Sequence, residues 1–341
     1  STSTIIAEKM NKETYFFFVK HLSFVIVSLI LLIIISSQKK DKILKFVVPL
    51  FFTSILLLFL VLIMGVEVKG SKRWLDFPFF PRFQPIELVK PLFILFTAKV
   101  IITNQKINIY RRIVVSFFVL FIIVILLIFQ PDLGQAILII ASWLTMIFVS
   151  GFNMIILTLL GASILLAITF LIYFFPSKFG YILLRIQTFI NPKTGDNFQS
   201  QKALDAIKQG GLTGQGMGEG ILKERVPEAH TDYIIAVISE EFGALFVLFI
   251  VIIFLFIGYK VLNKVFLMKD EFIKISLVGL VSLIIIQLFI HVGVNARLLP
   301  TTGMTLPFLS YGGSSLIGTS IIAGIILNFT RKDFTRSNKN E

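Results

Sequence analysis

The sequence predicts an all-α membrane protein, a polytopic bundle of transmembrane helices. Hydrophobic residues fill 56% of the 341 positions and charged residues only 15%, whereas soluble proteins carry about 25% charged residues. The apolar residues come in blocks of roughly twenty, the length of helix that crosses a hydrocarbon core. A soluble fold of this composition would expose large apolar patches to water, so we expect the chain to lie in a bilayer.

Nine apolar blocks predict nine spans in one membrane domain, residues 1–341. They cover residues 21–37, 46–65, 86–103, 113–129, 134–151, 154–175, 233–259, 272–293 and 314–330. A polar stretch, residues 176–232, separates the sixth block from the seventh and predicts one large extracytoplasmic loop. Within it, residues 200–209 have the pattern of a short amphipathic helix that Gly210 ends, with Leu204 and Ile207 on its apolar side. We expect this helix to lie on the outer leaflet.

The distribution of basic residues predicts the orientation. Lysine and arginine concentrate in short cytoplasmic loops, and here they cluster around Lys39, Arg111, Lys264 and Arg331. If the nine spans alternate, all four clusters lie on one face, which places the C-terminus in the cytoplasm and the long loop outside. Orientation therefore explains most of the net charge of +13, and no nucleic-acid partner is expected. The absence of cysteine excludes disulfides and thiolate chemistry.

Charged residues at the predicted outer face break the orientation rule. Arg73 and Arg82 precede a span that begins near Pro85, and Glu87 and Lys90 then lie on one face of its first turns, three residues apart. A charge inside a span is costly and is usually paired or faces a cavity. Two interpretations stay open: a structural ion pair near the membrane surface, or the wall of a polar cavity.

Two turn-forming segments follow at the outer face. Gln130-Pro131-Asp132 forms a tight turn that leaves Asp132 at the membrane edge, where it could simply cap the next helix. Residues 210–220 hold a glycine-rich run without the spacing of a P-loop or of a dinucleotide fingerprint. A flexible backbone that can approach a ligand is all that this run indicates.

The end of the long loop gathers groups suited to proton transfer. Glu228, His230 and Asp232 come within five residues, and Glu240 lies farther along the helix that follows. A partly buried carboxylate there has its pKa raised towards the range of a general base. The alternative is that Thr231 or Asp232 caps that helix, and the two roles are compatible.

A polar stripe and an irregular loop complete the outer face. Gln287, His291 and Asn295 recur every four residues along an apolar span, and Arg297 follows them. Residues 299–315, which include Ser310, are rich in proline and glycine, and such a loop at membrane depth must pack against protein or water. We therefore expect it to form a re-entrant plug beside a shared cavity.

These segments together resemble the SEDS family (shape, elongation, division and sporulation), and the FtsW members more than the RodA members. The matching pieces, in the family's order, are GSKRW at 70–74, QPIE at 84–87 with Lys90, QPDLG at 130–134, PEAHTD at 227–232, EEFG at 240–243 and TLPFLSYGGSS at 305–315. Each piece is weak alone, and together they are specific. Ile86 departs from the pattern, since the family usually has a small residue there.

The resemblance implies ten helices, so the first family helix would be missing from this chain. It implies a peptidoglycan glycosyltransferase that polymerises lipid II, the undecaprenyl-diphosphate-linked disaccharide, at the outer face of the bacterial inner membrane, at the division septum. The implied partners are a class B penicillin-binding protein that crosslinks the strands and other membrane proteins of the divisome. The family's essential loop acid corresponds to Asp232, and its conserved cavity residues correspond to Glu87, Lys90 and Asp132.

In the predicted reaction Asp232 deprotonates a sugar hydroxyl of incoming lipid II, which attacks the anomeric carbon of the lipid-linked strand. Arg73, Arg82, Lys90 and Arg297 are candidates to neutralise the departing diphosphate, as is a divalent cation such as Mg²⁺ or Mn²⁺. We place Glu228, His230, Glu240 and Ser310 in the same cavity. A lipid II flippase that uses Arg82, Glu87 and Lys90 is an alternative, although no internal repeat of the kind common in transporters is found. A non-catalytic scaffold is another.

Overall fold

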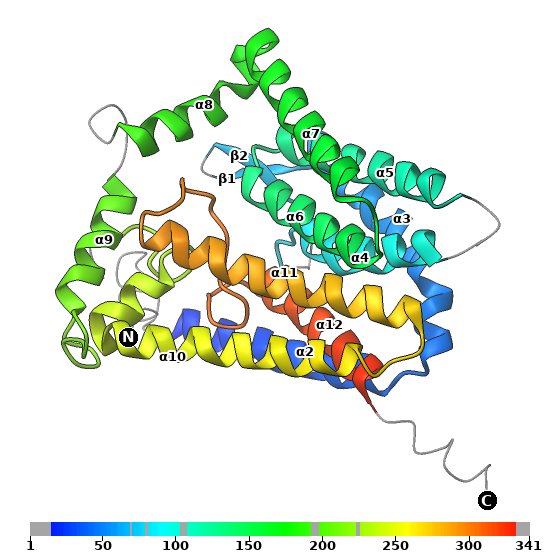
Figure 1. Ribbon diagram of the computed structural model, residues 1–341. Helices are drawn as coiled ribbons and strands as arrows, with labels where there is room; N and C mark the ends of the chain where they lie inside the picture. Colours follow the sequence, from blue (N-terminus) through cyan, green and yellow to red (C-terminus); the bar gives the residue numbers. More distant parts are fainter. Residues whose placement is uncertain are drawn as a thin grey trace, which may run out of the picture.

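The computed structural model describes residues 15–68, 70–78, 81–102, 108–191, 198–222 and 226–331. It is a helical bundle with one small β-hairpin (Figure 1). The helices are α2 (Phe16–Ser37), α3 (Lys40–Met64), α4 (Ile86–Ile102), α5 (Ile109–Phe129), α6 (Leu133–Val149), α7 (Met154–Phe174), α8 (Pro176–Ile190), α9 (Phe198–Gly210), α10 (Ile234–Val265), α11 (Glu271–Asn295) and α12 (Gly313–Thr330). The strands are β1 (Val66–Val68) and β2 (Ser71–Trp74).

A helix stands at each of the nine segments that the sequence predicts as spans. Among the described residues, six helices are long and apolar enough to cross a membrane: α2, α3, α5, α10, α11 and α12. Helices α7 and α8 meet at a bend of 105° and would count as a seventh if they form one broken span. Helices α4 and α6 have 17 residues each. The structure therefore shows a multi-span helical protein, and the count of nine stays a prediction.

Helix α11 is the centre of the bundle and crosses the molecule between α6 and α10 (Figure 1). Two thirds of its most apolar stretch, 67%, is buried. Gly279 lets it approach its neighbours, because an added Cβ would lie 2.6 Å from Ile94 of α4 and 2.7 Å from Met146 of α6. Small residues at such contacts are how membrane helices pack closely. The aromatic ring of Phe51 stacks on Phe96 at 4.3 Å and joins α3 to α4.

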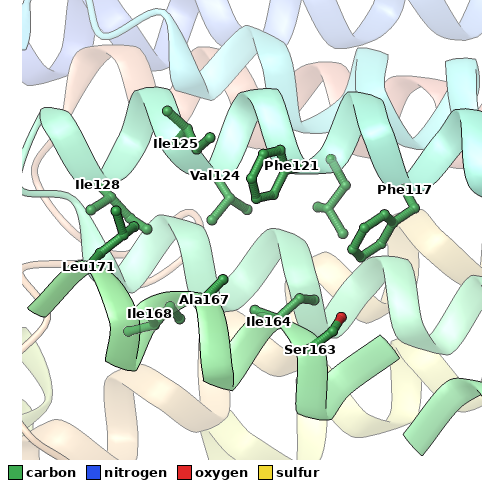
Figure 2. A pocket seen from close by; sticks show the side chains of 11 residues that line it. Phe117, Phe121, Val124, Ile125, Ile128, Ser163, Ile164, Ala167, Ile168 and Leu171 are labelled. Carbon is green, nitrogen blue, oxygen red and sulfur yellow. The ribbon is translucent and has the colours of Figure 1, made fainter. Parts of the chain in front are cut away.

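Two pairs of helices, α5 with α7 and α2 with α12, pack in different ways. Helix α7 faces α5 across a small cleft of about 40 Å³ (Figure 2). Its lining is apolar except for Ser163, whose hydroxyl donates to the carbonyl oxygen of Leu160 within α7. Helix α2 packs chiefly on α12, and Asn328 of α12 donates to the carbonyl oxygens of Ile35 and Gln38.

The predicted loop at 176–232 contains two helices, α8 and α9. Helix α9 confirms the predicted short helix, and it ends at Gly210 as expected. Its buried face differs from the prediction, because Ala203, Ala206 and Gly210 pack against α10 while Leu204 and Ile207 are only half-buried beside them. Residues 192–197 and 223–225 of this loop lie outside the described residues, as do residues 332–341 of the predicted cytoplasmic tail.

The glycine-rich run is bound to a break in α10. Gly243 has φ +82° and ψ 171°, which interrupts the helix. The loop fills the break with four backbone bonds: Gln215 N to Glu240 O, Gly216 N to Glu241 O, Ala244 N to Gly211 O, and Leu245 N to Leu212 O. The backbone of this run therefore approaches α10 closely.

Candidate functional site

A cavity of about 650 Å³ opens among the segments that the sequence places at the outer face. Its walls come from the β-hairpin, the start of α4, helix α8, residues 228–233, the end of α11 and the loop 301–312. Of the predicted site residues, Arg73, Glu87, Glu228, His230 and Asp232 line it. The loop 301–312 contributes Thr301 through Thr305, Tyr311 and Gly312, so it forms part of the cavity wall.

Three hydrogen bonds hold the backbone of residues 230–232. Asn295 donates through Nδ2 to the carbonyl oxygen of Asp232 at 3.0 Å. Ser310 donates to the carbonyl oxygen of Thr231 at 2.6 Å, and the Tyr311 amide donates to the carbonyl oxygen of His230 at 2.8 Å. These bonds tie the three residues to the end of α11 and to the loop, so their position is fixed by segments distant in sequence.

Neither Thr231 nor Asp232 is the N-cap residue of the helix that follows. Helix α10 starts at Ile234 with Tyr233 as its N-cap, and the Tyr233 side chain makes no capping bond. The amide of Ala236 donates to Oδ1 of Asn295 at 3.1 Å, as well as to the carbonyl oxygen of Tyr233 at 3.0 Å. Asn295 therefore takes the place of an N-cap side chain.

Glu228 and His230 stand beside Asp232 on the same turn. Glu228 has φ +57°, a left-handed conformation that is uncommon outside glycine. Thr231 donates to its carboxylate at 2.9 Å. The His230 ring lies 5.6 Å from the ring of Tyr311, which stacks on His21 at 5.4 Å. Together these contacts close one side of the cavity with aromatic rings.

Arg73 brings Asp132 to the edge of the cavity. The hairpin, paired through Glu67 with Lys72 and Val68 with Ser71, carries Arg73 to the turn before α6. There its guanidinium donates to the carbonyl oxygens of Gln130 and Pro131 and lies 3.7 Å from Oδ1 of Asp132.

The Asp132 carboxylate is buried in that turn and also accepts from Gln84 at 3.2 Å. Burial raises its pKa above the ordinary value, while the positive charge of Arg73 opposes that shift. Asp132 therefore supports Arg73 from behind the cavity wall.

Glu87 and Lys90 form a buried ion pair of 2.8 Å, and each side chain is at most 1% exposed. Glu87 also lines the cavity, whereas Lys90 does not, so the ion pair reaches the cavity wall through Glu87. Lys90 donates to Gln287 of α11 at 3.4 Å, and Gln287 donates to the carbonyl oxygen of Thr305 at 2.8 Å. The pair thereby connects α4 to the loop of the cavity wall.

Besides Asp132, five predicted cavity residues contact other groups and do not line the cavity. Arg82 is exposed and binds Asp76 at 2.9 Å. Arg297 donates to Gln201 of α9 at 3.0 Å. Glu240 accepts from the Leu222 amide at 2.7 Å and holds the glycine-rich loop. Ser310 bonds to backbone atoms, and Lys90 is enclosed with Glu87. Their predicted roles beside the substrate stay predictions.

The structure adds Arg185 to the site. It projects from α8, lines the cavity and donates to the carbonyl oxygen of Thr301 at 3.3 Å. In the sequence it is one of several basic residues in the polar stretch 176–232. The polar composition of residues 176–232 predicts a loop and not α8, and it therefore does not place Arg185 at the cavity.

Metal ligands are sparse in the described part of the chain. No group of three or more His, Cys, Asp or Glu side chains there is placed to hold a metal ion. Mg²⁺ is commonly bound through one or two carboxylates and the phosphates of a substrate. Glu228 and Asp232 both line the cavity and could supply those carboxylates.

A protein-family model for FtsW, RodA and SpoVE, described as "Cell cycle protein", matches residues 1–334 of the chain. The chain belongs to the FtsW, RodA and SpoVE family. This confirms the resemblance to the SEDS proteins. The family match covers all the described segments that build the cavity.

Two similar proteins of known sequence are named as FtsW proteins. The chain is 35% identical over 269 residues to a probable peptidoglycan glycosyltransferase FtsW of Caulobacter vibrioides, covering 79% of this chain and 67% of that one. It is 34% identical over 340 residues to the probable peptidoglycan glycosyltransferase FtsW of Trichlorobacter lovleyi, covering 97% and 87%.

Two solved structures have the same fold. A chain from a peptidoglycan synthase complex that coordinates polymerisation and crosslinking has a TM-score of 0.77 and 25% identity, with 95% of this chain and 91% of that chain covered. The rod shape determining protein RodA of Thermus thermophilus has a TM-score of 0.66 and 23% identity, with 92% and 87% covered.

Proposed function

We propose that the chain is a peptidoglycan glycosyltransferase that polymerises lipid II during cell division. The observation that carries this proposal is the cavity, which brings Asp232 together with Arg73, Glu228 and His230 in a chain of the FtsW, RodA and SpoVE family. The names of its FtsW relatives support the same activity.

In this reaction the carboxylate of Asp232 takes the proton from a sugar hydroxyl of incoming lipid II. The hydroxyl oxygen forms a bond to the anomeric carbon of the lipid-linked strand, and the bond from that carbon to the diphosphate oxygen breaks. The electron pair leaves with undecaprenyl diphosphate, whose negative charge requires positive groups close by. The hydrogen bonds to the backbone of residues 230–232 hold the base in place for this step.

The proposal extends to the location, the partner and the metal ion of the enzyme. We place the chain in the bacterial inner membrane at the septum, with the cavity outside and the C-terminus in the cytoplasm. A class B penicillin-binding protein is its proposed partner, which the likeness to a peptidoglycan synthase complex supports. Mg²⁺ or Mn²⁺ held by Glu228, Asp232 and the substrate diphosphate stays a prediction.

The flippase alternative loses part of its support. It depends on Arg82, Glu87 and Lys90 along one path, but Arg82 is exposed and bound to Asp76, while Lys90 is enclosed by Glu87. Movement of fluorescent lipid II across vesicles that contain only this chain would favour the flippase.

The test is polymerisation of purified lipid II by the full chain, with and without the transpeptidase. Asp232→Asn should lower the rate by about 10²-fold or more, the contribution of a general base. Asp205→Asn is the matched control, because Asp205 lies on α9 and pairs with Lys202 and Gln201. A wild-type rate for Asp232→Asn would refute the proposed role, and a normal division phenotype for that variant would favour a scaffold.

A further inference from the structure

Two guanidinium groups from distant parts of the chain face the same cavity. Arg73 comes from the hairpin and Arg185 from α8, and both line the wall that also carries Asp232. Arg82, Lys90 and Arg297 do not line it, because each is engaged by Asp76, Glu87 or Gln201. Of these five basic side chains, Arg73 and Arg185 are therefore the two placed to contact a ligand in the cavity.

Both arginines are held in position by the backbone of the cavity wall. Arg73 donates to the carbonyl oxygens of Gln130 and Pro131, and Arg185 donates to that of Thr301. A guanidinium has five N–H donors, so these bonds orient the groups and leave further donors for a ligand. Holding two like charges at one cavity favours an anion with more than one negative charge.

The space between Arg73 and Asp232 is kept open by Gly303. This residue has φ +67°, and a Cβ added to it would lie 3.5 Å from Nη1 of Arg73 and 3.6 Å from Oδ2 of Asp232. A ligand atom beside Gly303 would therefore lie near both the positive group and the proposed base.

We propose that Arg73 and Arg185 form the subsite that binds the diphosphate of the lipid-linked strand and stabilises it as it leaves. The proposal rests on the proposed function and names the residues that take up the leaving group. Planar guanidinium groups suit phosphate oxygens because they can donate two parallel hydrogen bonds. As the anomeric C–O bond breaks, negative charge grows on the diphosphate, so these contacts strengthen in the transition state.

The experiment measures binding of farnesyl diphosphate and farnesyl monophosphate to the purified full chain, with no lipid II present. Arg185→Gln should weaken diphosphate binding by about 10-fold to 100-fold, the size of a charge-assisted contact. Its effect on the monophosphate should be smaller, and Arg185→Lys should restore part of the loss. Lys202→Gln is the control for lost charge, since Lys202 pairs with Asp205 on α9 and does not line the cavity.

Binding without turnover separates the two proposals. If Arg185→Gln and Lys202→Gln bind farnesyl diphosphate equally well, the subsite is refuted, even where the wild-type chain polymerises lipid II. If the wild type binds the diphosphate through Arg185 but does not polymerise lipid II, the subsite stands and the proposed function fails. In active protein, Arg185→Gln should lower kcat more than it raises KM, whereas a variant with a damaged fold would also melt at a lower temperature.

Discussion

Asn295 shows how one side chain can position another without touching substrate. Its amide nitrogen donates to the carbonyl oxygen of Asp232, and its amide oxygen accepts from Ala236. Asn295 is fully buried at the end of α11. Because it satisfies a carbonyl and an amide of the same turn, it couples the start of α10 to the central helix of the bundle.

Asn295→Leu should therefore reduce both stability and catalysis. It removes the donor to the carbonyl oxygen of Asp232, at a cost of about 1–3 kcal/mol, and it frees the turn that carries Asp232, while the Ala236 amide keeps its bond to the carbonyl oxygen of Tyr233. We expect a lower melting temperature and a kcat for lipid II polymerisation reduced at least about tenfold, because small misplacements of a base are costly.

Asn153→Ala is the matched control for that variant. Asn153 caps α7 by accepting from the Ile155 amide, and it does not line the cavity. Its loss should lower the melting temperature while kcat stays near the wild-type value. Equal effects of the two variants on kcat would mean that Asn295 acts through stability alone.

At the scale of elements, the break in α10 depends on the glycine-rich loop. Gly214 has φ +82°, and a Cβ there would collide with the backbone of Glu241 and Phe242. Glu240 supports the same loop by accepting from the Leu222 amide. The loop thus binds backbone groups that a continuous helix would have satisfied by itself.

Gly214→Ala should destabilise the protein by at least about 2 kcal/mol, from the left-handed conformation together with the collision. Gly218→Ala is the control, because Gly218 has φ +91° but no atom lies within 4 Å of its added Cβ. The free energy of unfolding in detergent should fall more for Gly214→Ala. Hydrogen exchange at the amides of Gln215 and Gly216 should also rise in that variant only.

For the whole molecule, hydropathy predicted the helices better than it predicted the cavity. The apolar blocks matched nine helices because a bilayer imposes length and composition on each span. The motifs led to Asp232 and Glu87, since polar groups at membrane depth are rarely accidental. The contacts of Arg82 with Asp76 and of Arg297 with Gln201 could not be predicted, because they depend on how the segment after the hairpin and α9 fold.

Arg185 shows the limit of sequence reasoning at this site. Its role depends on α8, which bends sharply away from α7 and carries the residue over the loop at Thr301. Periodicity within one segment cannot reveal a contact between residues 116 positions apart. Tertiary packing alone brings the two arginines to one cavity.

The orientation of the whole molecule can be tested because the chain has no cysteine. Single cysteines placed at Lys202 on α9 and at Lys264 on α10 should react differently with a membrane-impermeant maleimide in bacteria whose outer membrane has been permeabilised. Lys202→Cys should label in these cells while the inner membrane is intact, and Lys264→Cys should label only after lysis. The reverse pattern would place the cavity in the cytoplasm and contradict the proposed reaction.

The pairing of α2 with α12 has a consequence for biosynthesis. Helix α2 has only 6% of its most apolar stretch buried, and Asn328 of α12 binds its last carbonyl oxygens. At about 5–20 residues per second, a ribosome needs tens of seconds to travel from one helix to the other. During that time α2, with a mean hydropathy of 2.6, can be stable in lipid without its partner. Helix α12 has a mean hydropathy of only 1.5 and is synthesised when α2 is already inserted.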